Sequence, residues 1–349
     1  MAVIVLKKIT ILFALLGIAA LTAITAWLGV GHVLNAMRRI GYDGFALLVL
    51  GQALVNCLLG LAWWATCPFL GAGRTIAARF IRDAAGNCLP FSQLGGMIAG
   101  IRATCFDFTS HRRRVIEWPE AVATNLADIT AEVIGQIAFI LIALLCLIGH
   151  QDGARFTWPL LGGMGLLSLG IAGFVYTQHR GGAAIRWLAQ FFGKHIAESW
   201  RDSLVDNIDA FQSELDRIWS RPGRVARGTL VHLLGWLASA ALTLMAFRFL
   251  GASLSYLDAV AIEGVVCGVM SAGFLVPASL GVQEGAYVAL GVIFGIAPDV
   301  ALGISLLRRG RDLAIGIPVL LVWQALEMRR LQHPAAQDRS VAPPSRASS

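Results

Sequence analysis

The stretch Ser271-Ala-Gly-Phe-Leu-Val-Pro277-Ala-Ser279-Leu-Gly281-Val-Gln-Glu284-Gly285 places a proline, a serine, a glycine and a carboxylate between two apolar segments. Irregular backbone at membrane depth is tolerated only where protein buries it or where it lines a wet cavity. A carboxylate inside a membrane span costs about 2.5–3.5 kcal/mol on insertion scales, so it marks a functional site by default. We therefore predict that this stretch forms half of a polar site inside a membrane bundle.

The composition of the whole chain also indicates a polytopic membrane protein. Of its 349 residues, 57% are hydrophobic and 14% are charged, whereas soluble domains have about 45–50% apolar and about 25% charged residues. The net charge of +7 is spread over loops, which fits the positive-inside rule and contact with anionic lipid, and argues against a nucleic-acid partner. The six cysteines show no metal-binding spacing, so no metal site and no cofactor are predicted.

The apolar runs predict an all-α fold, with one transmembrane domain over 1–328 and a disordered tail over 329–349. Eight spans are expected, at 9–30, 44–67, 121–149, 157–177, 228–250, 256–275, 283–297 and 298–328. Three further segments are expected: an interfacial amphipathic piece at 68–83, a re-entrant segment at 86–101 and an amphipathic cytoplasmic helix at 194–220. Positive charge concentrates in 68–120 and 178–227, which predicts that both termini are cytoplasmic.

One face of the span at 121–149 is polar. Asn125, Asp128, Glu132 and Gln136 are spaced by three, four and four residues, which places them on one helical stripe. Carboxylates four residues apart repel each other when both are ionised. Either one of them is protonated, therefore, or an arginine from elsewhere lies between them. The stripe is either a helix end in water or the wall of a polar cavity.

The last span carries four charged residues in its middle. Arg308 and Asp312 are four residues apart and can pair within the helix. Arg309 and Arg311 then remain for an acidic residue of the preceding spans, such as Glu284, or for a ligand. The charges are either a structural ion-pair network or part of a headgroup site.

The first half of the chain contains a segment that is similar to the broken stretch. Leu89-Pro90-Phe-Ser92-Gln-Leu-Gly95 repeats the order proline, serine, glycine of Val276-Pro277-Ala-Ser279-Leu-Gly281. Broken apolar segments at corresponding positions of two halves indicate a transporter-type binding site. The ends of half-helices present free N–H groups, which suit a phosphate or carboxylate headgroup.

At these residues the chain resembles the flippase-like transmembrane region of lysylphosphatidylglycerol synthases and their stand-alone relatives, over most of residues 40–325. The residues that stand in the places of the family pattern are Pro277, Gly281, Glu284, Gly285, Gly295, Ala301 and Arg309. In the first half Asn87, Pro90 and Arg102 match, Asp128 is retained, and Ser92 replaces an arginine of the pattern. The run from Asn87 to Gly96 is similar to a branch associated with hopanoid biosynthesis in bacteria.

This resemblance implies an integral protein of the bacterial inner membrane that binds and translocates a lipid, either an anionic phospholipid or a hopanoid. The alternative is an accessory scaffold for membrane-bound lipid-biosynthesis enzymes, which would dock on the helix at 194–220. We do not expect an enzyme, and no catalytic residues are predicted. The predicted lipid-binding residues are Asn87, Pro90, Ser92, Arg102, Asp128, Glu132, Pro277, Ser279, Gly281, Glu284 and Arg309.

Overall fold

The computed structural model describes residues 30–88, 92–106, 116–148, 210–272 and 281–332, together with isolated positions between 158 and 169. Every regular element in this part of the chain is helical, which confirms the all-α prediction. The span expected at 9–30, most of the span at 157–177 and the tail lie outside the described residues, so the number of eight spans stays a prediction.

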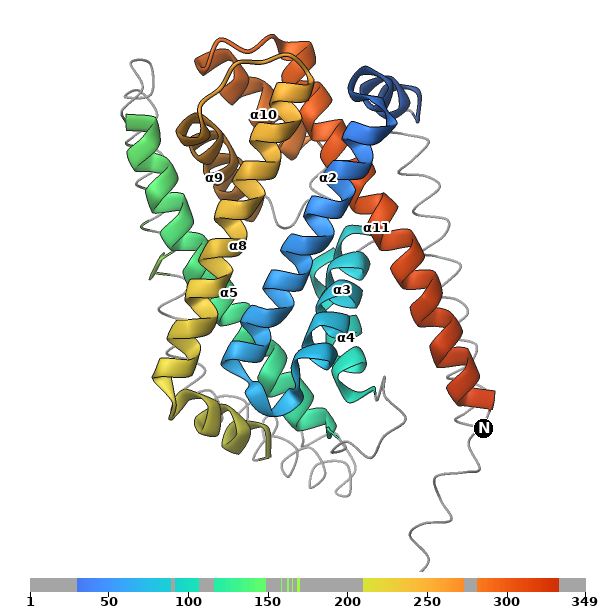
Figure 1. Cartoon of the computed structure of the whole chain (residues 1–349). Helices are drawn as coiled ribbons and strands as arrows, with labels where there is room; N and C mark the ends of the chain where they lie inside the picture. Colours follow the sequence, from blue (N-terminus) through green and yellow to red (C-terminus); the bar gives the residue numbers. More distant parts are fainter. Residues whose placement is uncertain are drawn as a thin grey trace, which may run out of the picture.

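Four long helices form the frame of the bundle (Figure 1). They are α2 (Val30–Thr66), α5 (Trp118–Ile148), α8 (Pro222–Phe249) and α11 (Pro298–Gln332). Among the described residues, three stretches are long and apolar enough to cross a membrane: Arg38–Thr66, Trp118–Leu147 and Pro222–Phe249. Their outward faces expose large apolar side chains such as Leu50, Leu54 and Leu145, as a lipid-facing surface requires. We call the end where α2 ends and α5 and α8 begin the lower end.

Helix α2 is longer than the span expected at 44–67. It begins at Val30 and runs through residues 31–43 with a single break. The break is confined to Gly41, whose φ of 74° and ψ of 164° kink the helix. A positive φ of this kind is accessible to glycine at little steric cost, so a single residue is enough to redirect the chain.

Two helical hairpins enter this frame from opposite ends (Figure 1). The 3-10 turn η1 (Pro68–Leu70) leads into α3 (Ala72–Cys88), which pairs with α4 (Ser92–Cys105) at the lower end. At the other end α9 (Tyr256–Ala272) pairs with α10 (Val282–Ile293). The longest of these four helices has 17 residues, about 26 Å at 1.5 Å per residue, which is short of the roughly 30 Å hydrocarbon core.

These hairpins change the predicted topology. Residues 86–101, expected to form a re-entrant segment, include the end of α3 and most of α4, which pack against each other. The prediction that 68–83 is an interfacial piece is wrong, because α3 lies inside the bundle with Arg79 and Arg82 only 5% and 6% exposed. The segments at 256–275 and 283–297, expected to be full spans, form the two short arms of the second hairpin.

Glycines shape both hairpins at defined positions. Gly96 lies against the backbone of α3, where an added Cβ would come within 2.8 Å of the carbonyl oxygen of Arg82. Close approach of this kind through small residues is typical of helix pairs in membranes. Gly281 precedes α10 with a φ of 77°, and its N–H donates to the Glu284 carboxylate at 2.9 Å. Glu284 therefore caps the start of the helix that follows the break.

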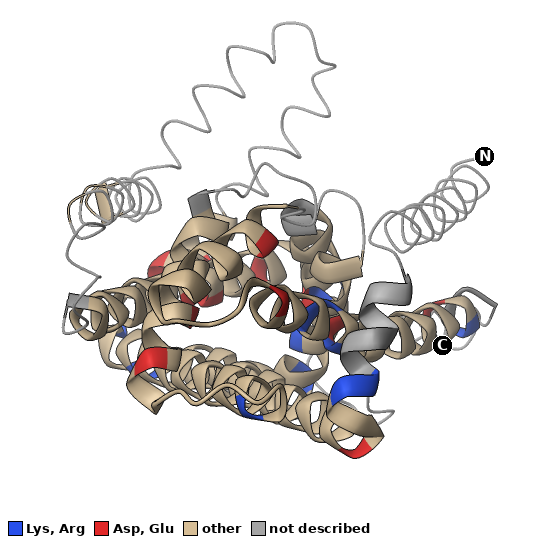
Figure 2. Ribbon diagram, turned by 90° about the horizontal axis from the view of Figure 1, so that it is seen from above, with Lys and Arg blue, Asp and Glu red and all other residues tan. Residues whose placement is uncertain are grey.

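The two largest apolar clusters of the described bundle interior have a polar layer between them. Along α2, Leu48 belongs to the upper cluster and Trp63 to the lower one, and Gln52 and Asn56 lie between them. The same order is found on α5 (Glu132 and Gln136 between Ala131 and Ile140), on α8 (Ser239 between Val225 and Ala246) and on α11 (Arg308 to Asp312 between Ile304 and Trp323). Figure 2, which looks down the bundle, shows several acidic and basic residues between the helices in the interior.

The amphipathic helix expected at 194–220 is described only from residue 210. Residues 210–219 are helical, and Leu215 and Ile218 are buried in the lower cluster, with Phe211 and Trp219 packed against it. This agrees with the prediction that the helix packs under the bundle. Its residues before 210 lie outside the described part of the chain.

Candidate functional site

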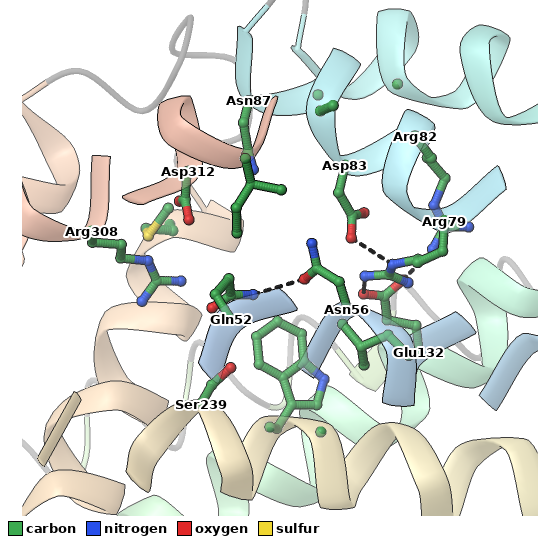
Figure 3. A pocket seen from close by; sticks show the side chains of 18 of the residues that line it. Gln52, Asn56, Arg79, Arg82, Asp83, Asn87, Glu132, Ser239, Arg308 and Asp312 are labelled. Carbon is green, nitrogen blue, oxygen red and sulfur yellow. Dashed lines mark hydrogen bonds and ion pairs between the residues drawn. The ribbon is translucent and has the colours of Figure 1, made fainter. Parts of the chain in front are cut away.

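The polar layer contains a cavity of about 430 Å³ that is lined by residues of the long helices and of both hairpins. We call it the central pocket (Figure 3). Its polar lining consists of five arginines, three acids, five amides and two serines: Arg79, Arg82, Arg308, Arg309, Arg311, Asp83, Glu132, Asp312, Gln52, Asn56, Asn87, Gln136, Gln283, Ser239 and Ser271. The volume is within the range of small-molecule sites.

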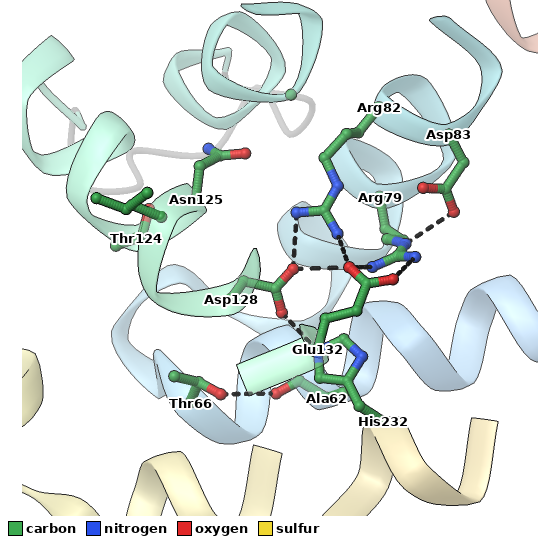
Figure 4. A network of polar contacts seen from close by, with 12 residues as sticks. Ala62, Thr66, Arg79, Arg82, Asp83, Thr124, Asn125, Asp128, Glu132 and His232 are labelled. Carbon is green, nitrogen blue, oxygen red and sulfur yellow. Dashed lines mark hydrogen bonds and ion pairs between the residues drawn. The ribbon is translucent and has the colours of Figure 1, made fainter. Parts of the chain in front are cut away.

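One wall of the pocket is a network of charges between α3, α5 and α8 (Figure 4). Both terminal nitrogens of Arg79 donate to the Glu132 carboxylate at 2.8 and 2.7 Å, and its Nε donates to Asp83 at 2.7 Å. Arg82 contacts Glu132 at 2.8 Å and Asp128 at 2.8 Å. His232 Nε2 lies 2.9 Å from the other oxygen of Asp128. The two guanidinium groups thus join three carboxylates into one network.

This network resolves both alternatives left open for the polar stripe of α5. Asp128 and Glu132 are separated by arginines, because Arg82 contacts both carboxylates. The stripe is also not a helix end in water, since Asp128 is 0% exposed and Asn125 is 1% exposed. The Arg82 guanidinium further lies 5.2 Å from the centre of the Trp63 ring, so cation–π attraction contributes to its position.

The opposite wall is built from α9, α10 and α11. Arg308 forms an ion pair with Glu263 and donates to the Tyr287 hydroxyl at 3.0 Å. Tyr287 and Thr243 donate to the other oxygen of Glu263 at 2.7 and 2.8 Å. The prediction that Arg308 pairs with Asp312 is wrong, because a carboxylate from α9 occupies this guanidinium.

The expected partner of Glu284 is present. Arg309 Nε donates to Glu284 Oε1 at 2.7 Å, and Arg309 Nη2 contacts the second oxygen at 3.2 Å. Arg311 bonds its chain neighbour Asp312 at 3.0 and 2.9 Å. Each arginine of this wall is therefore bound to a carboxylate. The helix break and the last long helix are joined through the Arg309–Glu284 pair.

The upper hairpin is attached to α5 through an amide. Gln136 Nε2 donates to Ser271 Oγ and to Cys267 Sγ, both at 2.8 Å. On α10, Gln283 donates to the hydroxyl and the carbonyl oxygen of Ser305 on α11. These contacts fix both arms of the hairpin close to its tip, where they line the pocket.

The predicted site residues fall into four groups, apart from Gly281, which precedes α10. Asn87, Glu132 and Arg309 line the central pocket, whereas Asp128 and Glu284 lie behind its wall and bind the arginines that face it. Arg102 does not belong to the pocket, because its side chain is 45% exposed and pairs with Glu327. Pro90, Pro277 and Ser279 lie outside the described residues, and only the backbone of Ser92 is described, at the start of α4.

Sequence reasoning missed the two arginines that organise the first wall. Arg79 and Arg82 were assigned to the membrane surface because they stand in a polar segment. The spacing of Arg79 and Asp83, four residues apart just before the glycines of the hairpin tip, was the available signal. Tyr287 was also missed, since a tyrosine in an apolar helix gives no charge signal.

The walls of the central pocket are close to electrically balanced. Among the described residues, five guanidinium groups face or flank it, with six carboxylates bound to them, namely Asp83, Asp128, Glu132, Glu263, Glu284 and Asp312. Three buried polar atoms of lining residues form no hydrogen bond in this part of the chain: the Gln52 carbonyl oxygen, the Trp236 indole N–H and Arg82 Nη1, the last of which is in an ion pair with Asp128. In the described residues, no group of three or more histidine, cysteine or acidic side chains is arranged to hold a metal.

The fold and the site define a polytopic helical membrane protein with two short helical hairpins that enter from opposite ends around an interior charged pocket. The family model of the lysylphosphatidylglycerol synthase transmembrane region matches residues 12–319. The chain therefore belongs to this family, and the resemblance found from the sequence is confirmed. Neither a curated protein nor a solved structure matched the chain.

Proposed function

We propose that this protein binds the headgroup of a polar lipid in the central pocket and moves the lipid between the leaflets of the bacterial inner membrane. The observation that carries the proposal is the polar cavity of about 430 Å³ midway between two apolar clusters. A headgroup that crosses a bilayer needs polar partners at the depth where lipid offers none. The acyl chains would stay in the surrounding bilayer.

The architecture supports a transport role over a purely structural one. Broken apolar segments from two halves of the chain that meet inside a bundle are the arrangement in which transporters place their binding sites. The family is named after the membrane region of an enzyme that modifies a lipid. A lipid is therefore the class of ligand that we expect. Gln52 and Trp236 each offer a buried polar atom that a headgroup hydroxyl or carbonyl would satisfy.

The balance of positive and negative charges in the central pocket determines which kind of headgroup the pocket favours. Each arginine of the pocket already binds a carboxylate, so the walls offer little net positive potential to a bare anion. The proposal therefore favours a neutral or zwitterionic headgroup over an anionic one. A hopanoid, implied by the run from Asn87 to Gly96, stays among the candidate lipids, and an anionic phospholipid is less favoured at this site.

The burial of the amphipathic helix argues against the scaffold alternative. Docking on the amphipathic helix requires a free apolar face, but Leu215 and Ile218 are 1% and 5% exposed because they pack into the lower cluster. The proposal also excludes lipid-modifying catalysis by this chain. A new lipid product from extracts incubated with the purified protein would overturn that part.

The experiment is lipid scrambling in proteoliposomes, followed with headgroup-accessible fluorescent lipids. We expect transport by the wild-type protein, and its loss in Arg309→Ala and Glu284→Gln, because each leaves the other member of the pair uncompensated beside the pocket. Arg102→Gln serves as the control: it removes a charge from a pair outside the pocket and should retain transport. If the Arg309 and Glu284 variants transport as well as Arg102→Gln, the site is wrong.

A further inference from the structure

A second cavity, of about 390 Å³, lies at the lower end of the bundle. The end of α2, the turn η1 and the start of α8 surround it. Its lining includes Thr66, Phe69 and the three arginines Arg217, Arg221 and Arg224. We call it the basic pocket.

The basic pocket lies at the boundary of the apolar layer. The apolar stretch of α2 ends at Thr66, and those of α5 and α8 begin at Trp118 and Pro222. Trp118 is 53% exposed, as expected for the aromatic belt at the level of lipid headgroups. A pocket that contains Thr66 and the first turn of α8 is therefore open to the depth where phosphates of the bilayer are found.

The charges of this pocket differ from those of the central pocket. Arg217 donates to Glu120 at 3.2 Å, contacts Glu214, and lies 4.5 Å from the centre of the Phe69 ring. Arg221 and Arg224 have no carboxylate partner within the described part of the chain. Among the described residues, the two carboxylates at this pocket, Glu120 and Glu214, both bind Arg217, so Arg221 and Arg224 are available to a ligand.

We propose that the basic pocket binds the phosphodiester of an anionic phospholipid from the adjoining leaflet. The guanidinium groups of Arg221 and Arg224 present paired N–H donors, which match the oxygens of a phosphate. The single negative charge of a phosphodiester would lie between these two arginines. Arg217, held by two acids and the Phe69 ring, forms the fixed wall. This lipid is bound at the rim and is distinct from the lipid handled in the central pocket.

The test compares variants in bilayers of defined composition. The protein is reconstituted in phosphatidylcholine nanodiscs with increasing phosphatidylglycerol, and phosphatidylglycerol retained per protein is counted by native mass spectrometry. Each hydrogen bond to a charged group contributes about tenfold or more to an equilibrium constant, so Arg221→Gln with Arg224→Gln should weaken retention at least about tenfold.

The matched control also removes two arginine charges, but from positions outside the basic pocket. Arg227 on the exposed side of α8 bonds the Gly223 carbonyl oxygen at 3.3 Å, and Arg248 is at the opposite end of that helix. Arg227→Gln with Arg248→Gln should retain phosphatidylglycerol like the wild type. Equal loss in the control pair would mean diffuse surface attraction and would overturn the proposal.

A second arm separates a lipid from a soluble anion. Inorganic phosphate is added to the protein in pure phosphatidylcholine nanodiscs, and the thermal unfolding midpoint is measured. The proposal expects no stabilisation by phosphate alone and a rise in the midpoint with phosphatidylglycerol that the Arg221 and Arg224 variants lack. Stabilisation by phosphate without anionic lipid would contradict a lipid ligand. Neither result depends on whether the central pocket transports lipid.

Discussion

Arg82 is the residue whose removal best measures the energy of the first wall. Its guanidinium contacts Asp128 and Glu132 at 2.8 Å each, and only 7% of its side chain is exposed. In Arg82→Ala the two carboxylates, one turn apart on α5, lose the cation that separates them. Asp128 is fully buried, so water cannot replace the lost partner.

The expected destabilisation follows from these contacts. Removal of one partner of a buried ion pair costs about 3–5 kcal/mol. Arg79 continues to bind Glu132 and lies 3.8 Å from Asp128, so part of the compensation survives. We therefore expect Arg82→Ala to lower the free energy of unfolding by about 3 kcal/mol, at the lower end of this range.

The assay is unfolding by sodium dodecyl sulfate in mixed micelles, followed by circular dichroism. The double variant Arg82→Ala with Asp128→Asn should recover part of the loss, because it removes the uncompensated charge, which gives a coupling energy of about 1–3 kcal/mol. Arg227→Ala, at an exposed position, should change stability by less than about 0.5 kcal/mol. A loss below about 1 kcal/mol in Arg82→Ala, or strict additivity in the double variant, would refute the network as described.

Three further predictions concern the upper hairpin. Tyr287→Phe removes a buried hydroxyl that donates to Glu263 at 2.7 Å, and should lower the free energy of unfolding by about 1.5–3 kcal/mol in the same assay. Gln136→Leu releases the tip of the hairpin from α5, so the buried Cys267 thiol should react faster with a maleimide than in the wild type; an unchanged rate would show that other contacts hold the tip. Gly264→Val should destabilise strongly, since an added Cβ would already lie 2.2 Å from a side-chain carbon of α5, while wild-type stability would mean that α5 and α9 are not in close contact.

The helical class and the position of the second break could be predicted because both leave local signals. A proline and glycines in an apolar run reveal an interrupted helix, and Glu284 inside that run indicated a partner, which the structure identifies as Arg309. The expected separation of Asp128 and Glu132 by an arginine also followed from their spacing. These inferences need only one helix and the cost of an isolated charge in lipid.

The identity of most partners could not be predicted, because it depends on how helices pack. Arg79 and Arg82 meet Asp128 and Glu132 across about fifty residues of chain, and the local sequence of α3 is polar enough for a surface helix. Arg308 had an acid within its own helix, yet Glu263 of α9 is its partner. The segments of α9 and α10 are so apolar that their hydropathy predicts full spans. Hydropathy does not reveal that two such helices are short and pair in a hairpin.

The most direct test of the central claim is to block the central pocket without changing its charges. Asn56 lines the pocket on α2 and is 6% exposed, whereas Leu54 on the outer side of the same helix is 70% exposed. Scrambling of a fluorescent lipid with a neutral or zwitterionic headgroup is measured for Asn56→Trp and Leu54→Trp, with the folded fraction of each variant checked by detergent unfolding. A headgroup route through this pocket predicts that folded Asn56→Trp loses transport and Leu54→Trp keeps it. Equal transport by the two variants would contradict the route.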